Sequence, residues 1–302
     1  MMGEEISGRL KGFRSGFVML AGAPNAGKST LLNRILGEKV SITSKKAQTT
    51  RNRILGVLHR EGAQLVFMDT PGVHRATQGL NVRMVDVALA AMGDADLILF
   101  MVDLKSPDPD AEGFVLEKLE KQPRHVVLAL NKTDQVPAEA VLQAIDRWRT
   151  VYPFQAVVPI SAKHGHQVDA LVEEMAGMLS EGPPFFPEDA LTDMPERFIA
   201  AEMIREKVFR LTGQEIPYAT AVTVESFEEK ERMVSIHATI HVERSSQKAI
   251  VIGKGGSKLK QIGQAAREDM ERMLGTQVFL RLFVRVQKNW SRDTRALRKF
   301  GY

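Results

Sequence analysis

The chain has 302 residues, no cysteine and a formal net charge of +4 at pH 7. That length suits two domains of about 100–200 residues each, and the lack of cysteine excludes disulfides and thiolate metal sites. The apolar content of 44% is ordinary for a globular protein. No apolar run approaches the ~18 residues of a membrane-spanning helix, and residues 1–16 lack the apolar core of a signal peptide, so a cytoplasmic protein is expected.

The charge is distributed unevenly along the chain. Residues 1–197 contain 22 Lys and Arg against 25 Asp and Glu, a balance of −3, whereas residues 198–302 contain 19 against 12, a balance of +7. From residue 244 onward the count is 14 against 4, a balance of +10. A basic carboxyl-terminal part predicts a polyanionic partner, and on charge alone both nucleic acid and an anionic membrane surface remain open.

Apolar runs of strand length alternate with helical patterns through the first 180 residues. We predict strands at 16–22, 54–58, 65–69, 97–103, 125–131 and 156–161. We predict helices at 29–36, 81–92, 109–120, 137–150 and 168–179. This alternation indicates a doubly wound, mostly parallel α/β sheet, in which ligands bind at the carboxyl ends of the strands.

A phosphate-binding motif follows the first predicted strand. The pattern G-x-x-x-x-G-K-[ST] is matched by Gly22, Ala23, Pro24, Asn25, Ala26, Gly27, Lys28 and Ser29, with Thr30 next in the following helix. Its glycines let backbone N–H groups face phosphate oxygens, and the helix adds its positive end. Lys28 is expected at the β and γ phosphates and Ser29 on Mg²⁺. The alternative is a glycine-rich turn with no ligand, which the strand–loop–helix context disfavours.

Two further segments are expected to complete the triphosphate site. The third strand ends in Asp69, Thr70, Pro71 and Gly72, so that Asp69 can hold Mg²⁺ through water and the Gly72 N–H can contact a γ-phosphate. The polar loop 41–53 is interpreted as a switch loop whose Thr50, with Thr49 as the alternative, reaches Mg²⁺ and the γ-phosphate. A second mobile segment is expected from 73 to 79. Lys28, Thr50 and Gly72 are thus the predicted catalytic residues, and Ser29, Thr50 and Asp69 the predicted metal ligands.

Base recognition is expected at the next two strand ends. Asn131, Lys132 and Asp134 follow the fifth strand, and a carboxylate at 134 accepts both the N1–H and the N2 amine of guanine. Adenine leaves such a carboxylate unpaired, at a cost of about 1–3 kcal/mol or more. Ser161, Ala162 and Lys163 follow the sixth strand, and the Ala162 N–H is a candidate donor to guanine O6. Either segment alone is an ordinary polar loop, so the prediction rests on the ordered set.

The segments GAPNAGKS, QTTR, DTPG, NKTD and SAK, in this order, resemble the translation-factor-related GTPases. The resemblance implies GTP and GDP as ligands. Val73 stands where Ras-like proteins carry a glutamine that orients water, and no arginine finger is recognisable, so slow unassisted hydrolysis is predicted. In several GTPases with this loop, an asparagine at the position of Asn25 helps to hold K⁺. K⁺ is therefore a further candidate cofactor, the alternative being that Asn25 only shapes the loop.

Proline interrupts the helical pattern at 181–197, which we interpret as a linker between domains at 1–180 and 198–302. In the second domain we predict helices at 198–211, 246–252 and 258–274, strands at 219–225, 234–242 and 278–286, and a charged hairpin loop at 227–232. Ile250 and Ile252 are expected in the core, with a platform for a base as the alternative for one of them. Trp290 is expected to anchor the basic tail, with base stacking as the alternative.

This order, with a G-x-x-G turn between two helices, resembles an α+β KH module of the bacterial type, type II. Such a loop clamps about four single-stranded nucleotides. The predicted RNA-binding residues are Gly253, Lys254, Gly255, Gly256 and Lys258. A basic domain that docks on protein is the alternative.

The segments GAPNAGKSTLLN, VSITSKKAQTTR, DTPG, FPEDALTD, REK, VIGKGG and LRKFGY together resemble the Era family of bacterial ribosome-assembly GTPases over nearly the whole chain. The resemblance implies a monomer that binds the 3′ end of 16S rRNA and the small ribosomal subunit, acts in maturation of that subunit, and associates peripherally with the inner membrane. Alternatives are a membrane-surface GTPase and an RNA-binding assembly module for which GTP is a structural ligand.

Overall fold

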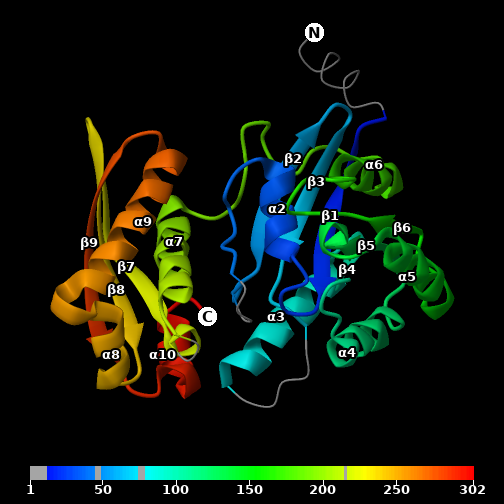
Figure 1. Cartoon of the computed structure of the whole chain (residues 1–302). Helices are drawn as coiled ribbons and strands as arrows, with labels where there is room; N and C mark the ends of the chain where they lie inside the picture. Colours follow the sequence, from blue (N-terminus) through cyan, green and yellow to red (C-terminus); the bar gives the residue numbers. More distant parts are fainter. Residues whose placement is uncertain (1–11, 45–48, 74–78, 214–215) are drawn as a thin grey trace, which may run out of the picture. The chain divides into compact units, whose positions relative to one another are not determined.

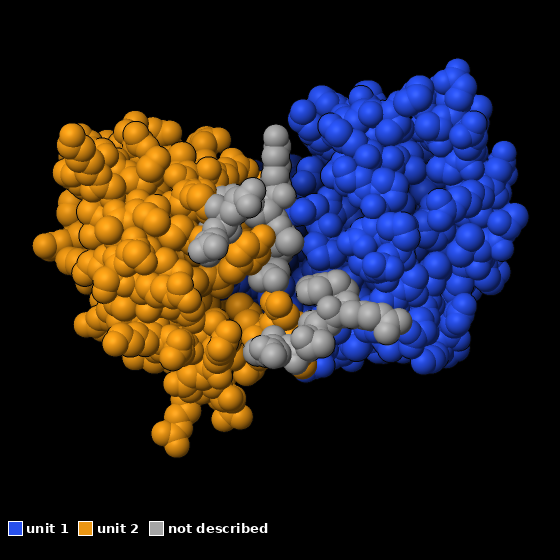
Figure 2. Space-filling view, turned by 60° about the horizontal axis from the view of Figure 1, so that its bottom comes forward, with its two compact units in different colours: residues 1–41, 50–76, 84–193 blue, residues 42–49, 77–83, 194–302 orange. Residues whose placement is uncertain are grey.

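The computed structural model describes residues 12–44, 49–73, 79–213 and 216–302. The chain divides into two compact units, shown in separate colours in Figure 2. The first unit comprises residues 1–41, 50–76 and 84–193, and the second comprises 42–49, 77–83 and 194–302. No described helix is both long enough and apolar enough to cross a membrane.

The first unit is built on a six-stranded sheet with the strand order β2-β3-β1-β4-β5-β6 (Figure 1). The strands are β1 Arg14–Gly22, β2 Ile54–Arg60, β3 Ala63–Asp69, β4 Leu97–Asp103, β5 His125–Asn131 and β6 Ala156–Pro159. Only the β2–β3 pair is antiparallel; the other neighbours run parallel. The predicted doubly wound sheet is confirmed, and strand β2 extends two residues beyond its predicted end.

Helices cover both faces of this sheet because alternate strand residues bury in two separate cores. One core joins the strands to helices α2 and α6, and the other joins them to α3, α4 and α5. The helices are α2 Lys28–Leu36, α3 Gly79–Asp94, α4 Pro109–Leu119, α5 Ala138–Val151 and α6 Val168–Met178, with the 3₁₀ turn η1 at Thr133–Gln135. Strands β3 and β4 are buried along their whole length, as expected for central parallel strands.

Residues 190–192 run along the sheet edge formed by β2, whereas residues 181–186 contact β1 and β3. The Val57 N–H donates to the Leu191 carbonyl (2.9 Å), and Thr192 Oγ1 donates to the Leu55 carbonyl (2.6 Å). The Phe185 ring packs on Phe17 of β1, with centroids 4.9 Å apart. The proline-rich segment is therefore fixed to the first unit by backbone and side-chain contacts.

The second unit contains a three-stranded sheet, β7-β8-β9, whose one face packs on helices α7, α8 and α9 (Figure 1). Its elements are α7 Glu196–Leu211, η2 Pro217–Ala219, β7 Ala221–Lys230, β8 Met233–Val242, α8 Ser245–Ile252, η3 Lys254–Gly256, α9 Ser257–Leu274, β9 Gln277–Val286, η4 Trp290–Arg292 and α10 Thr294–Lys299. Strand β8 pairs antiparallel with β7 and parallel with β9. Within this unit, the Thr43 N–H of segment 42–49 donates to Glu206 Oε1 of α7 (3.0 Å).

The structure corrects two expectations for the second unit and confirms a third. The charged loop at 227–232 is mostly strand, because Phe227 turns into the core while Glu228 faces outward, leaving two residues for the turn. Ile250 is 50% exposed, and Val251 fills the core in its place. The tail is anchored as predicted: Trp290 is fully buried, and its Nε1 donates to the Ala219 carbonyl (3.0 Å).

Candidate functional site

The phosphate loop joins the buried end of β1 to the start of α2. Lys28 is only 6% exposed, and its Nζ donates to the carbonyls of Gly22 (3.0 Å) and Ala23 (2.9 Å). Burial lowers the pKa of Lys28 to about 8, while the nearby Asp69 carboxylate opposes that change. The ammonium group is thus held over the loop by weak neutral acceptors. A phosphate group, which carries charge, is a stronger partner for it.

Two glycines of the loop are required by their surroundings. Gly22 has φ +148°, and a Cβ there would lie 2.5 Å from the Met101 carbonyl oxygen. Gly27 has φ +105°, and a Cβ there would overlap the Asn131 amide. That amide donates to the Ala26 carbonyl (2.8 Å). The loop is therefore locked to the carboxyl end of β5, which brings the phosphate and base motifs together.

Asp69 lies at the centre of a cluster of hydroxyl groups. Its Oδ2 accepts from Ser29 Oγ (2.6 Å), Ser41 Oγ (2.7 Å) and Thr50 Oγ1 (3.4 Å), and the Ser29 and Thr50 hydroxyls lie 2.9 Å apart. Burial raises the pKa of Asp69, and the hydrogen bonds from Ser29 and Ser41 oppose that shift. Its Oδ1 is buried without a hydrogen-bond partner among the described residues.

These oxygens fit Mg²⁺. A carboxylate with a spare buried oxygen and two converging hydroxyls supplies hard oxygen ligands, which leave positions for water and phosphate. Ser29, Thr50 and Asp69 would hold the ion, as predicted. When bound, Mg²⁺ neutralises the charge of the β and γ phosphates. Ser41 was not singled out, because one serine at the start of a polar loop carries no sequence signal.

The Asp-Thr-Pro-Gly segment packs directly against the phosphate loop. A Cβ at Gly72 would lie 2.6 Å from Pro24 Cα, and the Val73 N–H donates to the Gly22 carbonyl (3.1 Å). Thr70 Oγ1 donates to the Leu20 carbonyl (3.1 Å). Val73 is fully buried, so its side chain is directed into the core rather than toward a water. Residues 45–48 of the predicted switch loop and 74–78 of the predicted second mobile segment lie outside the described residues.

The carboxylate of the predicted base-recognition motif is held in position, and the Asp134 side chain is 15% exposed. Asp134 Oδ1 accepts from Ser161 Oγ (2.6 Å), and this hydrogen bond is the main reason that the pKa of Asp134 is lowered. Asp134 Oδ2 lies 3.6 Å from His164 Nε2. The Ala162 N–H donates to Asn131 Oδ1 (3.0 Å). The predicted contact of this N–H with guanine O6 therefore requires a shared hydrogen bond.

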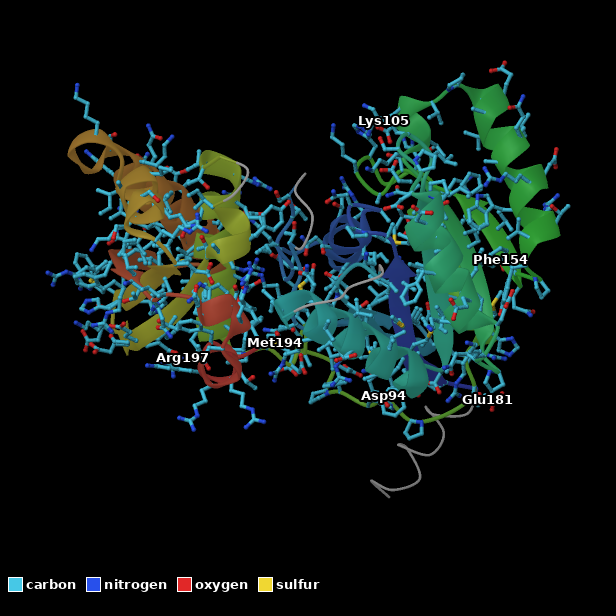
Figure 3. All side chains as sticks on the ribbon, turned by 90° about the horizontal axis from the view of Figure 1, so that it is seen from below. Asp94, Lys105, Phe154, Glu181, Met194 and Arg197 are labelled. Carbon is cyan, nitrogen blue, oxygen red and sulfur yellow. The ribbon has the colours of Figure 1, made fainter. Side chains whose placement is uncertain are left out.

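Asp103, at the end of β4, is a site residue that sequence reasoning missed. It pairs with Lys132, whose backbone has the left-handed φ of +66°. Its Oδ1 accepts from the N–H groups of Lys105 (3.0 Å) and Ser106 (3.2 Å), which shape the loop on which Lys105 lies (Figure 3). Like Asp69, Asp103 is the last residue of a buried strand, and this position in the sequence could have identified it as a candidate site residue.

Two side chains of α2 tie the surrounding loops to the phosphate-binding helix, and neither was predicted. Asn33 Oδ1 accepts from the N–H groups of Val40 (3.0 Å) and Ser41 (2.9 Å), which fixes the start of the predicted switch loop. Arg34 donates to the carbonyls of Ala162 (3.4 Å) and Lys163. Residues in the interior of a helix form no recognisable sequence motif, so these contacts are evident only in the structure.

The G-x-x-G turn of the second unit lies between α8 and α9. Gly253, Gly255 and Gly256 have φ values of +73°, +60° and +78°. Lys254 is exposed and Lys258 half-buried at the start of α9. The N–H groups of Gly253 and Gly256 donate to the carbonyls of Ala249 (2.8 Å) and Gly253 (3.1 Å), so the positive φ values of these glycines shape the turn itself. The predicted RNA-binding residues are thus gathered on one turn.

Proteins of known family share both parts of this architecture. A family model described as 50S ribosome-binding GTPase matches residues 17–132, and a KH domain model matches residues 215–291. GTPase Era of Geotalea uraniireducens is 56% identical over 97% of this chain and 99% of its own length. GTPase Era of Geobacter metallireducens is 56% identical over 96% and 98%. The chain belongs to the Era family of GTPases.

Solved structures of Era proteins share the fold of both units. A variant of Aquifex aeolicus Era bound to GDP and AlF4⁻ matches with a TM-score of 0.92 and 41% identity over 96% of this chain and 99% of that one. A crystal structure of Era in complex with MgGDPNP and nucleotides 1506–1542 of 16S ribosomal RNA matches with the same score, identity and coverage. As a member of the Era family, the chain is a GTPase with a KH domain.

Proposed function

We propose that Gly22–Thr30 and Asp69–Gly72 bind the phosphates of GTP with Mg²⁺, and that Asn131, Lys132, Asp134 and Ser161–Lys163 bind the guanine base. The observation that carries this proposal is the convergence of the Ser29, Thr50 and Asp69 oxygens beside a buried lysine. Lys28, Thr50 and Gly72 act on the γ-phosphate. Val73 is buried, so hydrolysis without a partner is slow.

We further propose that residues 198–302 form the RNA-binding domain, joined by the linker 181–197 to the GTPase domain of residues 1–180. The G-x-x-G turn and Lys258 contact 16S rRNA, and the protein acts in the cytoplasm in assembly of the small ribosomal subunit. The support is the charge balance of +7 over 198–302 (19 Lys and Arg against 12 Asp and Glu), the exposed turn, and the relative solved with nucleotides 1506–1542 of 16S rRNA.

Nucleotide and RNA binding are tested together on the full chain. The protein should bind GTP at least about 100-fold more tightly than ATP, because adenine leaves Asp134 unpaired. The double substitution Lys254→Asp and Gly255→Asp should abolish binding of the 1506–1542 RNA while GTP affinity stays unchanged. Equal affinity for ATP and GTP would contradict the nucleotide assignment, and retained RNA binding by the double variant would contradict the KH assignment.

We propose that the nucleotide state controls RNA binding. Its support is the position of Ser41 at the start and of Thr50 near the end of the predicted switch loop 41–53, since both donate to Asp69. Loss of the γ-phosphate therefore changes the environment of both ends of the loop. RNA crosslinking in GTP and in GDP, mapped to nucleotides, should give different patterns. Identical patterns and affinities would favour a purely structural role for GTP.

K⁺ is a proposed second cation at the phosphate loop. Asn25 is exposed and has the left-handed φ of +65°, so its amide is accessible beside the phosphate-binding N–H groups. Hydrolysis should be several-fold faster in KCl than in NaCl at equal ionic strength, since a cation there neutralises transition-state charge. Asn25→Ala should remove the difference. Equal rates of the unsubstituted protein in the two salts would show that Asn25 only shapes the loop.

A further inference from the structure

Strand β9 carries an alternating row of aromatic and basic side chains on its outer face. Its inward residues Val278, Leu280, Leu282, Val284 and Val286 pack in the core of the second unit. The outward residues are Phe279, Arg281, Phe283 and Arg285, which we call the aromatic–arginine row. Phe279 is 50% exposed and Phe283 45% exposed. Half-exposed phenylalanines forgo hydrophobic stabilisation, and such patches mark interaction sites.

The tail of the chain covers one end of this sheet face and leaves the row open. Phe300 packs on His241, with ring centroids 4.6 Å apart, and Trp290 packs on Phe300 at 5.2 Å. His241 is consequently only 5% exposed. Phe279 and Phe283 lie further along the sheet, opposite Ser235 and Thr239 of β8. The tail thus closes part of the outer face and leaves two phenyl rings uncovered.

The chemistry of the row favours an anion with flat rings. The Arg281 guanidinium lies over the Phe283 ring, 5.1 Å from its centroid, and His237 meets the edge of Phe279 at 6.3 Å. Across the described residues, neither Arg281 nor Arg285 forms an ion pair with a carboxylate. The carboxylates of this face, Glu225 and Glu228, are on β7, and Glu225 Oε1 accepts from Thr239 Oγ1 of β8 (2.6 Å) instead of pairing with an arginine of the row. Aromatic rings that alternate with unneutralised cations combine base stacking with phosphate attraction.

The row also has a suitable spacing. Residues two apart on one face of a strand are about 6.6 Å apart, so Phe279 and Phe283 are separated by about 13 Å. Sheets that bind RNA through exposed aromatics stack two or three bases over such a surface. Stacking requires unpaired bases, because the rings of a duplex are already stacked.

We propose that Phe279, Arg281, Phe283 and Arg285 form a second RNA-binding surface, which takes two or three unpaired nucleotides on the sheet face opposite the helices. It lies apart from the G-x-x-G turn, which joins helices α8 and α9 on the other face. The inference rests on the proposed RNA binding by the second unit. The surface extends the RNA contact beyond the nucleotides that the turn can hold.

The test compares two variants of the full chain with two RNAs. The row variant combines Phe279→Ala and Phe283→Ala, and the turn variant combines Lys254→Asp and Gly255→Asp. Phe185→Ala is the matched control, because that phenylalanine is 54% exposed but lies outside the second unit. The probes are the 1506–1542 RNA and its single-stranded tetranucleotides, which suffice for the turn alone.

The row variant should lose about 10- to 100-fold in affinity for the long RNA and less than twofold for the tetranucleotide that binds best. The turn variant should lose affinity for both RNAs. If the turn variant binds both RNAs normally, the proposed RNA function fails. If the turn variant loses binding but the row variant holds the long RNA within twofold of the control, the second surface is refuted. A row variant that loses a protein partner or binding to phosphatidylglycerol vesicles, with RNA affinity unchanged, also refutes it.

A second measurement avoids any loss of folding. Phe283→Trp keeps an aromatic ring and adds a fluorophore at the row, while Trp148 and Trp290 are buried, at 5% and 0% exposure. Stacking of a base on residue 283 should quench the added fluorescence when the long RNA binds. Unchanged fluorescence at saturating RNA would overturn the proposal.

Discussion

The nucleotide site and the G-x-x-G turn are built in opposite ways. At the nucleotide site, Lys28 and Asp69 are almost fully buried and bonded to neighbouring groups, with only one oxygen of Asp69 unpartnered. At the turn, Lys254 is exposed and the glycines present backbone to solvent. The first site is organised before its ligand arrives, and the second is an open surface that depends on backbone conformation. Side-chain substitutions should therefore dominate at the first site, and backbone changes at the second.

The largest effect is expected at Lys28. Lys28→Ala removes the buried cation that we propose contacts the transferred phosphate, so GTP hydrolysis should fall by about 100- to 1,000-fold. Lys121→Ala is the control, since that side chain is 66% exposed and on the surface. Single-turnover rates with saturating GTP give the comparison. A loss below tenfold would mean that the phosphate site is less organised than its burial suggests.

Asp134→Asn should have the next largest effect and should change base preference. An amide leaves one guanine donor unpaired, so GTP affinity should fall by about 10- to 150-fold, whereas xanthosine triphosphate should gain affinity. Asp146→Asn, on the exposed side of α5, is the control. Titration with fluorescent GTP and xanthosine triphosphate measures both changes. Unchanged preference would place base recognition elsewhere.

At the turn, Gly253→Ala and Gly256→Ala form a matched backbone pair. Gly253 has φ +73° and ψ 174°, a region that is nearly restricted to glycine, and an added Cβ would lie 2.6 Å from Lys258 Cβ. Gly256 has an ordinary left-handed conformation and open space around it. Gly253→Ala should cost about 2 kcal/mol in stability and Gly256→Ala about 1 kcal/mol.

RNA affinity should follow the same order for the two glycine variants. Urea unfolding and filter binding of the 1506–1542 RNA measure the two quantities. Equal losses of stability and of RNA affinity in the two variants would show that the geometry of the turn does not govern RNA binding there.

An effect of pH is expected at His241 under the tail. Burial lowers the pKa of His241 to about 4, and Arg285 adds to this shift. The unfolded chain takes up this proton below about pH 6.5, whereas the folded chain resists it until about pH 4. The contribution of His241 to stability should therefore fall by about 3 kcal/mol as the pH drops from 6.5 to 4, and it should change little below pH 4.

His241→Gln should remove that part of the pH dependence, because glutamine has no proton to gain. Thr223 Oγ1 lies 2.9 Å from His241 Nε2, and the glutamine amide can replace that partner. Urea unfolding at pH 4, 5 and 6.5 gives the measurement. An unaltered slope in the variant would assign the acid sensitivity to other groups.

Sequence reasoning predicted the strands of the first unit and the order of its motifs because buried parallel strands are continuous apolar runs. It placed Ser29, Asp69 and Asn131 at strand and helix ends, and the structure brings them together. It missed Asp103, although the end of a buried strand marks that position, and it missed Ser41, whose contact with Asp69 depends on how a distant loop folds back. Tertiary contacts of this kind leave no local period or spacing.

In the second unit, the sequence predicted the helices and the turn but not which isoleucine faces outward. The α8 pattern Ala249–Ile252 is apolar at every position, so no period distinguishes the core residue Val251 from the exposed Ile250. The charged residues at the end of β7 concealed a strand, because alternation of Phe227 and Glu228 was masked by neighbouring acids. Periodicity cannot distinguish buried from exposed positions where neighbouring residues are all apolar or all charged.

The segment that runs along β2 has a consequence for how the molecule avoids self-association. An edge strand with unpaired N–H and carbonyl groups is a template for pairing with another copy. The Leu191 carbonyl accepts a hydrogen bond from the Val57 N–H, and Thr192 Oγ1 donates one to the Leu55 carbonyl. The proline-rich connection therefore also shields the exposed border of the sheet, so a fragment cut at residue 180 would bare that border, whereas one ending at residue 193 would keep its cover.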